Sequence, residues 1–238
     1  MMLKLQNITV VYPDKTKAID GIDLCVNKGE NVAIIGENGA GKTTLLLAIV
    51  GTFELPTGVI EIDGVRLSEK TVNEIRKQTG LVFQNPDDQL FMPFIFDDVA
   101  FGCRNFGMRE DLIKTRVDET LAQLGISRLS SRSSLRLSSG EKRMAAIATV
   151  LAMEPSILMF DEPSAFLDHK ARRLLIETLK KLPHTKIIAT HDLSFVSEVC
   201  SRVIVLKNGR IAADGNLSLL RNREILHNCG LETITEFS

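Results

Sequence analysis

The eight residues from Gly36 to Thr43 constrain this 238-residue chain more than any other segment. They read GENGAGKT and fit the pattern GxxxxGK[ST] without a mismatch. The apolar residues 31–35 before them predict a buried strand, and residues 44–50 after them predict a helix. A glycine-rich turn between such a strand and helix lets backbone N–H groups and the helix N-terminus face a phosphate. The alternative is an ordinary glycine-rich turn that carries a surface lysine.

A phosphate-binding loop predicts a role for its polar residues. Lys42 would contact the β- and γ-phosphates of a nucleotide, and Thr43 would ligate Mg²⁺. The predicted nucleotide-binding residues of the loop and the first helical turn are Gly36, Glu37, Asn38, Gly39, Ala40, Gly41, Lys42, Thr43 and Thr44.

The rest of the chain predicts the fold around this loop. Strand-length apolar runs recur, with helical stretches between the later ones, at 5–12, 22–26, 32–35, 81–83, 157–160, 187–190 and 203–206. Such strands predict a buried, largely parallel sheet with helices on both faces. Asn208-Gly209 predicts a two-residue hairpin turn after the last run. Residues 86–153 contain helical patterns without a clear strand and predict an inserted helical subdomain.

Several predicted strands end in polar residues that suit metal or proton chemistry. Asp161 and Glu162 follow an apolar run, and strand alternation points them in opposite directions. Asp161 suits Mg²⁺, directly or through water, and Glu162 suits a general base toward an attacking water. Gln84 could reach the metal or the water, and His191 could reach the γ-phosphate. The alternatives are a solvated acidic turn and a histidine with a structural hydrogen bond.

A second turn rich in serine and glycine precedes a helix. Ser138 and Glu141 have the S-x-x-E spacing of a capping box. The apolar residues behind it have the i, i+3, i+4, i+7 spacing of a packed helix: Met144, Ile147, Ala148 and Leu151. Gly140 would cost stability, up to ~1 kcal/mol in a helix interior, and close approach of an anion would explain it. The alternative is a well-capped helix without a ligand.

These motifs appear in the order and rough spacing of an ATP-binding cassette (ABC) ATPase, which the chain resembles from about residue 3 to residue 215. The segments that carry the resemblance are Gly36–Thr43, Gln84, Leu137–Glu141, Asp161-Glu162, Ser164–Asp168 and His191. The resemblance implies a single α/β domain over 1–238, with a P-loop NTPase (RecA-like) core, an antiparallel β subdomain and the inserted helical subdomain. The implied boundaries are 1–85 and 154–220 for the core with the β subdomain, 86–153 for the helical subdomain and 221–238 for a short tail.

The resemblance also implies that the nucleotide is shared between two chains. ABC ATPases form a head-to-tail dimer that encloses two ATP molecules, so the expected partner is a second ABC ATPase copy, identical or not. Ser138 and Gly140, with Ser139 between them, would hold the partner's γ-phosphate, and Asp168 would communicate between the two sites. Tyr12 falls where the family stacks an aromatic ring on adenine; a strand-end aromatic packed on the core is the alternative. The expected cofactors are ATP and Mg²⁺.

A narrower resemblance concerns the cobalt/nickel and energy-coupling factor (CbiO-like) branch. It is carried by QNPDDQLF at 84–91, DDVAFG at 97–102, EKR at 141–143 and AMEP at 152–155. These ATPases power uptake of metal ions or vitamins through a separate membrane subunit, which the segment 84–101 would contact. The apolar residues of this segment suit such a contact or the core of the helical subdomain: Phe91, Met92, Phe94, Ile95 and Phe96.

Two positions depart from the family pattern. Ser139 stands where glycine is usual and adds a side chain beside the expected γ-phosphate, and Phe166 stands where a small residue is usual. Both departures put full hydrolysis at the shared site in doubt. An asymmetric pair with a non-identical ATPase is one interpretation.

Composition limits the other functions. The net charge is −1 and no basic block appears, so nucleic acid is not an expected partner. No apolar run approaches the ~20 residues needed to cross a bilayer, and residues 1–4 do not resemble a signal peptide. We therefore expect a soluble chain, peripheral on the cytoplasmic face of the cell membrane. Two competing functions stay open: a soluble ABC ATPase acting on a non-membrane partner, and an ATP-sensing module with little turnover.

Overall fold

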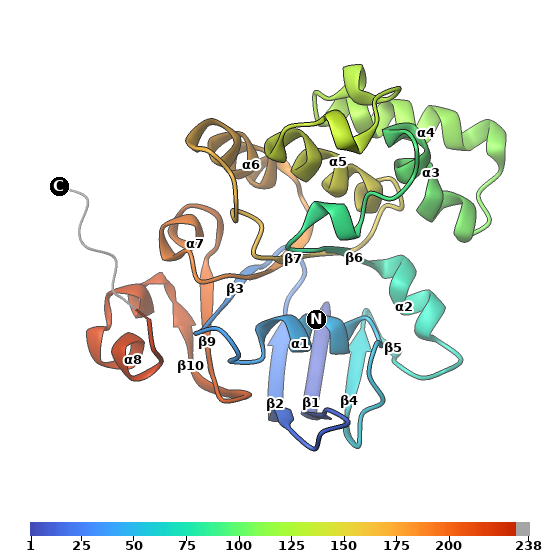
Figure 1. Ribbon diagram of the computed structural model, residues 1–238. Helices are drawn as coiled ribbons and strands as arrows, with labels where there is room; N and C mark the ends of the chain where they lie inside the picture. Colours follow the sequence, from blue (N-terminus) through green and yellow to red (C-terminus); the bar gives the residue numbers. More distant parts are fainter. Residues whose placement is uncertain (232–238) are drawn as a thin grey trace.

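The computed structural model describes residues 1–231, which form two β-sheets with helices around them (Figure 1). The larger sheet has the strand order β10-β9-β3-β8-β7-β6. Its strands are β3 (Asn31–Ile35), β6 (Thr79–Val82), β7 (Ile157–Asp161), β8 (Thr185–Ala189), β9 (Arg202–Lys207) and β10 (Arg210–Asn216). Neighbours pair in parallel except β9 and β10, which form the hairpin predicted at Asn208-Gly209. The predicted sheet and hairpin are confirmed.

The smaller sheet is antiparallel and has the order β2-β1-β4-β5. Its strands are β1 (Leu3–Val11), β2 (Lys17–Val26), β4 (Thr57–Ile62) and β5 (Val65–Arg66). Strands β4 and β5 were absent from the strands expected from sequence. They are joined by Asp63 and Gly64, which both have left-handed backbone conformations, with φ of 47° and 82°. This turn matches the right-handed twist of a tight hairpin.

Strand alternation divides the hydrophobic core between the two faces of the larger sheet. In β3, Val32 and Ile34 belong to one buried cluster with Leu45 and the residues of the antiparallel sheet. Ala33 and Ile35 belong to a second cluster, formed with the helices of residues 95–200. Because neighbouring side chains of a strand point to opposite faces, apolar residues at every position bury both faces. This explains why the sequence shows continuous apolar runs.

The helices are α1 (Lys42–Ile49), α2 (Val72–Gln78), α3 (Ile95–Asn105), α4 (Glu110–Gln123), α5 (Ser139–Leu151), α6 (His169–Lys181), α7 (Leu193–Val199) and α8 (Arg223–Asn228). Helix α1 begins at Lys42, two residues before its predicted start. No helix within residues 1–231 has the length and apolar character needed to traverse a bilayer. Of the expected tail 221–238, residues 223–228 form α8, and residues 232–238 lie outside the described part of the chain.

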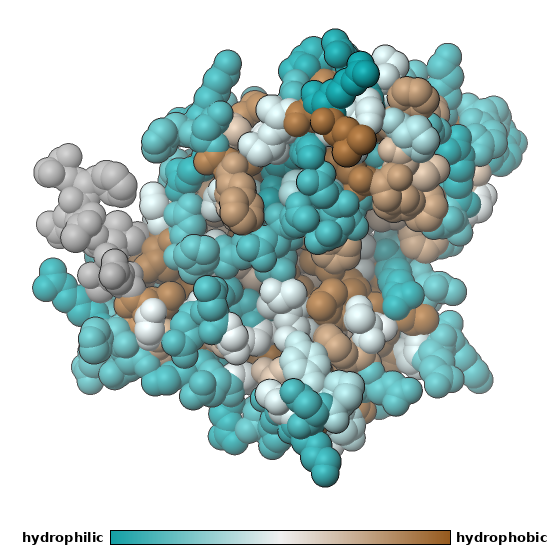
Figure 2. Space-filling view, viewed as in Figure 1, coloured by the Kyte–Doolittle hydropathy of each residue, from teal (hydrophilic) through white to brown (hydrophobic). Residues whose placement is uncertain are grey.

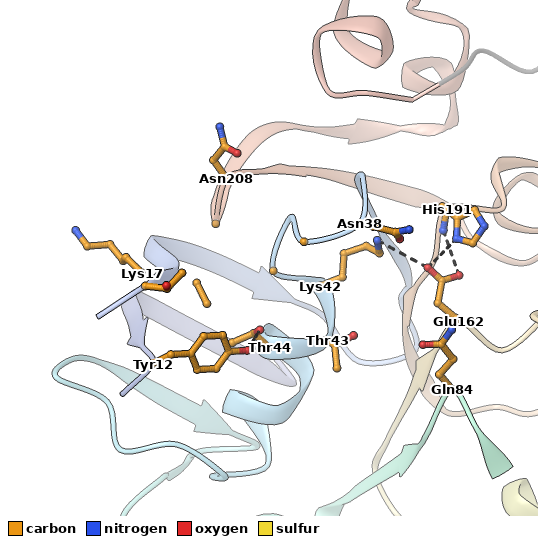
Figure 3. A pocket seen from close by; sticks show the side chains of 15 residues that line it. Tyr12, Lys17, Asn38, Lys42, Thr43, Thr44, Gln84, Glu162, His191 and Asn208 are labelled. Atoms are coloured by element: carbon orange, nitrogen blue, oxygen red, sulfur yellow. Dashed lines mark hydrogen bonds and ion pairs between the residues drawn. The ribbon is translucent and has the colours of Figure 1, made fainter. Parts of the chain in front are cut away.

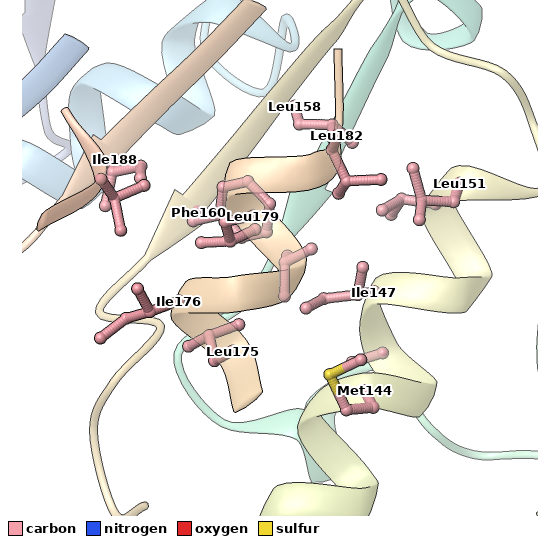
Figure 4. Packing of buried hydrophobic residues seen from close by; sticks show 14 of the residues in the cluster. Met144, Ile147, Leu151, Leu158, Phe160, Leu175, Ile176, Leu179, Leu182 and Ile188 are labelled. Atoms are coloured by element: carbon pink, nitrogen blue, oxygen red, sulfur yellow. The ribbon is translucent and has the colours of Figure 1, made fainter. Parts of the chain in front are cut away.

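Between β6 and β7 the chain is helical, as predicted, and α3, α4 and α5 lie together at one side of the larger sheet (Figure 1). Helix α5 is buried along its length from Arg143 to Leu151. Its predicted apolar positions pack against Leu175 and Leu179 of α6 and against side chains of β7 and β8 (Figure 4). The helix is therefore held between the helical region and the core sheet.

Candidate functional site

The predicted strand-end residues meet at the carboxyl edge of the larger sheet, where ligands bind in open α/β sheets. A cavity of about 630 Å³ lies there, between this edge and the antiparallel sheet (Figure 3). The predicted residues that line it are Tyr12, Asn38, Gly39, Gly41, Lys42, Thr43, Thr44, Gln84, Glu162 and His191. Thr16, Lys17, Ala18, Asn208 and Gly209, which the sequence analysis did not single out, complete the wall. Gly36, Glu37 and Ala40 belong to the same loop without lining the cavity.

The phosphate loop takes its shape from two close backbone approaches. Gly41, the N-cap of α1, has a φ of 104°, and a Cβ there would lie 2.7 Å from the carbonyl oxygen of Ala18. A Cβ on Gly36 would lie 2.5 Å from the carbonyl oxygen of Leu206. Only glycine fits either position. The loop therefore packs closely against the backbone of β2 and β9.

Lys42 is buried and points along the loop. Its Nζ donates to the carbonyl oxygens of Gly36 at 2.8 Å and Glu37 at 3.1 Å, and lies 3.8 Å from Oε1 of Glu162. The buried ammonium group thus lies close to the buried carboxylate that follows β7. An ammonium group held in this way, beside exposed backbone N–H groups, is a strong phosphate ligand.

Asp161 ends β7 with an oxygen available for a ligand. Its Oδ2 accepts a 2.8 Å hydrogen bond from Thr43 Oγ1, while its buried Oδ1 has no protein partner. Burial raises the pKa of Asp161, the Thr43 hydrogen bond opposes this, and the charge of Glu162 adds to the increase. A buried carboxylate oxygen without a donor, next to a hydroxyl, has the chemistry of a Mg²⁺ site completed by phosphate and water.

Glu162 lies at the centre of a hydrogen-bond cluster (Figure 3). Its Oε2 accepts from Thr190 Oγ1 at 2.8 Å and from the backbone N–H of His191 at 3.3 Å, and its Oε1 lies 2.9 Å from His191 Nδ1. The imidazole of His191 is 62% exposed and lines the cavity. From the sequence, a structural hydrogen bond and a position at the site were alternatives for His191. In the structure His191 has both: it contacts Glu162 and lines the cavity. Glu162 itself adopts a left-handed backbone, with φ of 43°.

Tyr12 follows β1 at the mouth of the cavity. Its hydroxyl is 2.6 Å from Thr44 Oγ1, and its ring meets the ring of Phe53 edge to face, with centroids 5.8 Å apart. The hydroxyl contact fixes the ring beside the first turn of α1. The ring is only partly buried, so one part of it faces the cavity (Figure 3).

Four predicted residues lie elsewhere. Ser138, Gly140 and Asp168 line a second hollow of about 600 Å³, at the N-termini of α5 and α6, and Ser139 is exposed beside them. Ser138 and Glu141 form the predicted capping box. The two hollows have no lining residue in common.

Helix packing beside the second hollow gives a different reason for Gly140 than the sequence suggested. A Cβ on Gly140 would lie 2.6 Å from Cβ of Ala171, so close packing of α5 on α6 already requires glycine. The anion proposed from sequence is not needed to explain this residue. Asp168 caps α6 by accepting from the N–H of Ala171 at 2.7 Å.

The sequence and the fold match those of known proteins. The sequence pattern of the ABC transporter family matches residues 19–165. The energy-coupling factor transporter ATP-binding protein EcfA of Carboxydothermus hydrogenoformans is 43% identical over 235 residues, which are 98% of this chain and 87% of that protein. This chain belongs to the ABC transporter family and is an ABC ATPase. As a member of this family it binds and hydrolyses ATP.

Solved structures agree with this assignment. CbiO1 from Clostridium perfringens, described as part of the ABC transporter complex CbiONQ, is similar with a TM-score of 0.83 and 39% identity over 95% of this chain and 93% of that one. The cassette MJ0796, solved as a dimer in a post-hydrolysis state with ADP and Pi, has a TM-score of 0.80 and 27% identity over 91% and 99%. The predicted CbiO-like resemblance is confirmed by EcfA and CbiO1.

The aromatic segment of this ABC ATPase divides between core and surface. Ile95 is buried and Phe96 packs on the core, whereas Phe91 and Phe94 are 61% and 49% exposed. Phe101 is also exposed, and its ring lies edge to face against Phe91 with centroids 4.9 Å apart. Figure 2 shows apolar surface over this side of α3. We call Phe91, Phe94 and Phe101 the aromatic patch. The core interpretation is confirmed for Ile95 and Phe96, and the contact with a membrane subunit stays a prediction for the exposed residues.

Asp98 fixes the backbone of the loop that carries Phe91. Its Oδ1 accepts from the N–H groups of Phe91 and Met92, each at 2.9 Å. Its buried Oδ2 has no partner, and burial raises the pKa of this carboxyl. The two hydrogen bonds therefore give the exposed loop a defined backbone geometry.

Phe166 is unusual among the residues of this ABC ATPase. It is 81% exposed and has a φ of 63°, a left-handed conformation that a bulky side chain rarely adopts.

Two further residues contact the predicted site and were missed in the sequence. Thr190, at the end of β8, orients Glu162. Arg143 of α5 donates to the carbonyl oxygens of Phe83 and Gln84. Burial lowers the pKa of Arg143 to about 10, so it stays protonated at neutral pH. The sequence signal that could have found Arg143 is a charged residue directly before the apolar part of a helix.

Proposed function

We propose that this chain is the ATP-hydrolysing subunit of a membrane importer. It would couple Mg-ATP binding and hydrolysis at a dimer interface to uptake of a cobalt or nickel ion, or of a vitamin, through separate membrane subunits. The observation that carries the proposal is the division of the predicted site residues between two hollows of one chain. In this proposal one hollow supplies the phosphate loop, the metal site and the base, and the other supplies the helix N-terminus that would contact the partner's phosphate.

Mg²⁺ would be held by Thr43, Asp161 and Gln84. The unpartnered Oδ1 of Asp161 and its hydrogen bond from Thr43 support this, because Mg²⁺ takes one or two carboxylate or hydroxyl oxygens and fills its shell with phosphate and water. Within residues 1–231 no cluster of three histidine, cysteine or acidic residues suits a metal, which fits a metal brought by the nucleotide. Bound Mg²⁺ would neutralise charge on the phosphates.

Glu162 would act as the general base. Thr190 and His191 fix its carboxylate, and Lys42 lies on the phosphate side of it. Fixed donors would orient this base toward the attacking water. General base catalysis of this kind raises the reaction rate by ~10²–10⁴-fold. His191 is exposed on the cavity side of Glu162, where it would reach the γ-phosphate.

The second chain would supply Ser138, Ser139 and Gly140. Helix N-termini with free N–H groups attract anions, and these residues lie at the exposed N-terminus of α5. The dimeric MJ0796 cassette supports a paired arrangement for a chain of this fold. Asp168 lies in the same hollow and would link the two nucleotide sites.

The aromatic patch would contact the membrane subunit. Its three phenylalanines are exposed, Phe91 contacts Phe101, and Asp98 fixes the backbone at Phe91, which makes a surface suited to a protein partner. The patch begins seven residues after Gln84, so a movement of the partner can be transmitted to the cavity through a short segment. The chain would thereby be peripheral on the cytoplasmic face of the membrane.

The test is purification of the tagged chain from its native membranes in mild detergent, followed by mass spectrometry of the complex. We expect hydrophobic membrane subunits and a second ABC ATPase chain, and we expect Phe91→Ser with Phe94→Ser to release the membrane subunits while turnover persists. Leu112→Ser, at an exposed leucine of α4, is the matched control. Recovery of the chain with soluble partners alone would contradict the importer assignment.

A further inference from the structure

Arg143 occupies a position that packing alone does not explain. It is 1% exposed, in the part of α5 that is buried on all sides. A buried guanidinium is costly unless its N–H groups find acceptors. An apolar residue of similar volume would fill the same space without that cost. The arginine therefore needs an explanation from its contacts.

Both polar contacts of Arg143 are made to the segment that follows β6. Its Nη1 donates to the carbonyl oxygen of Phe83 and its Nη2 to that of Gln84, each at 2.6 Å. Its buried Nε has no partner. The planar guanidinium thus spans two consecutive carbonyls, one of which belongs to the residue whose side chain lines the cavity.

Gln89 also connects the segment after β6 to α5. Its Oε1 accepts from the N–H of Phe83 at 3.1 Å, and its Nε2 donates to Ala146 O at 2.9 Å and to Thr149 Oγ1 at 2.7 Å. The backbone before Gln84 is therefore fixed to α5 through two side chains, while the Gln84 side chain stays exposed at the cavity (Figure 3).

We infer that Arg143 is a positioning residue that sets Gln84 relative to the nucleotide cavity and makes α5 the connection between the two hollows. Helix α5 begins at the Ser138 cap, in the second hollow, and Arg143 lies five residues further, about 7 Å along a rigid helix. A shift of the cap upon contact with a partner's phosphate would move the carbonyls of Phe83 and Gln84 with it. This inference rests on the proposed function, because it assigns Gln84 to the metal or the water.

The experiment is a double-mutant cycle between Arg143 and Gln84 in the full chain. Arg143→Met keeps the volume and removes both donors; Arg143→Lys keeps the charge and cannot span two carbonyls. For each variant, alone and with Gln84→Ala, one measures kcat, the Mg²⁺ concentration at half-maximal activity, and the affinity for a fluorescent ATP analogue without Mg²⁺. Lys142→Met is the matched control, because it removes a surface ion pair between the same helix and Asp87 of the same segment.

We expect both Arg143 variants to lower kcat about tenfold and raise the required Mg²⁺, with Mg²⁺-free affinity within about twofold. In the Gln84→Ala background the Arg143 variants should add no further loss, since residues that act through one group are non-additive. Lys142→Met should match the unsubstituted chain.

Three results would overturn the inference: an unchanged kcat, an equal loss with and without Gln84, or loss of nucleotide affinity in both Arg143 variants, which would make the residue structural. Absence of turnover in the unsubstituted chain would count against the proposed function instead. The cycle would then be measured on the Mg²⁺-induced change in nucleotide affinity, with the same criterion of non-additivity.

Discussion

The two hollows of this chain are built in different ways. The phosphate-loop hollow contains buried charges next to the ends of parallel strands: Lys42 lies 3.8 Å from Glu162, and Asp161 behind them accepts a hydrogen bond from Thr43. The second hollow is formed by exposed helix N-termini whose caps are complete within the chain. In the proposed function the first hollow would bind a nucleotide alone, whereas the second would offer an anion the N–H groups at the N-termini of α5 and α6.

This difference has an energetic consequence. Buried charges and left-handed non-glycine residues cost stability in the free chain, and the first hollow contains both, at Asp161 and Glu162. The second hollow contains neither: its capping box contributes to helix stability whether or not a ligand is present. Substitutions in the first hollow should therefore change binding and stability, and substitutions in the second that leave the helix caps intact should change turnover alone.

The largest expected effect is that of Glu162→Gln. Steady-state ATPase assays should show kcat lower by ~10²–10⁴-fold, because the amide cannot accept the proton of the attacking water. Equilibrium binding of ATP should persist, since the loop and Lys42 are unchanged. Unaltered turnover would remove Glu162 from the mechanism.

Lys42→Ala should weaken nucleotide binding itself. Loss of a charge-assisted hydrogen bond worth about 1.5–3 kcal/mol predicts roughly 10- to 150-fold lower affinity for ATP. Titration of a fluorescent ATP analogue measures this at protein concentrations where the chain is monomeric. Full-strength binding would refute the phosphate-loop assignment.

A matched pair of variants at Ser139 isolates the second hollow. Glutamate at this exposed first-turn position suits the helix dipole, so Ser139→Glu should keep the fold and the monomer's ATP affinity. Its charge should repel the partner's phosphate and lower turnover about tenfold relative to the uncharged Ser139→Gln. Equal turnover in the two variants would show that no anion approaches this hollow.

Asp161→Asn should stabilise the nucleotide-free chain, and the effect should depend on pH. Burial raises the pKa of Asp161 in the folded chain above its ordinary value of 3.8, so the ionised form opposes folding above that pKa. Thermal unfolding should show a gain of a few degrees, about 1 kcal/mol, at pH 8 that disappears as the pH falls toward 4. A gain that grows at low pH would contradict the assigned burial cost.

The sequence predicted best what is local. The phosphate loop, the capping box and the Asn208-Gly209 hairpin are contiguous patterns whose geometry follows from glycine conformations and nearby hydrogen bonds. The β4–β5 hairpin was missed although Asp63-Gly64 has the same local signal, because the strands around it are short. Its pairing with β1 joins residues far apart in the chain.

The remaining features depend on contacts distant in sequence. Arg143 meets Phe83 and Gln84 about 60 positions away, so nothing in its neighbours predicts the bonds. The reason for Gly140 lies in Ala171 of another helix. The aromatic segment could not be divided from sequence, because Phe94 and Ile95 are adjacent apolar residues at the start of α3, one exposed and one buried. The sequence therefore predicted the local motifs but not the contacts between residues far apart in the chain.

The most direct test of a site shared between two chains is a mixing experiment with Lys42→Ala and Ser139→Glu. Each variant alone has both composite sites damaged and should hydrolyse ATP slowly. Mixed dimers contain one intact site, made by the phosphate loop of one chain and the second hollow of the other, so an equimolar mixture should recover up to about a quarter of the activity of the unsubstituted chain. A mixture whose turnover equals the sum of its separate components at every ratio would contradict the shared site.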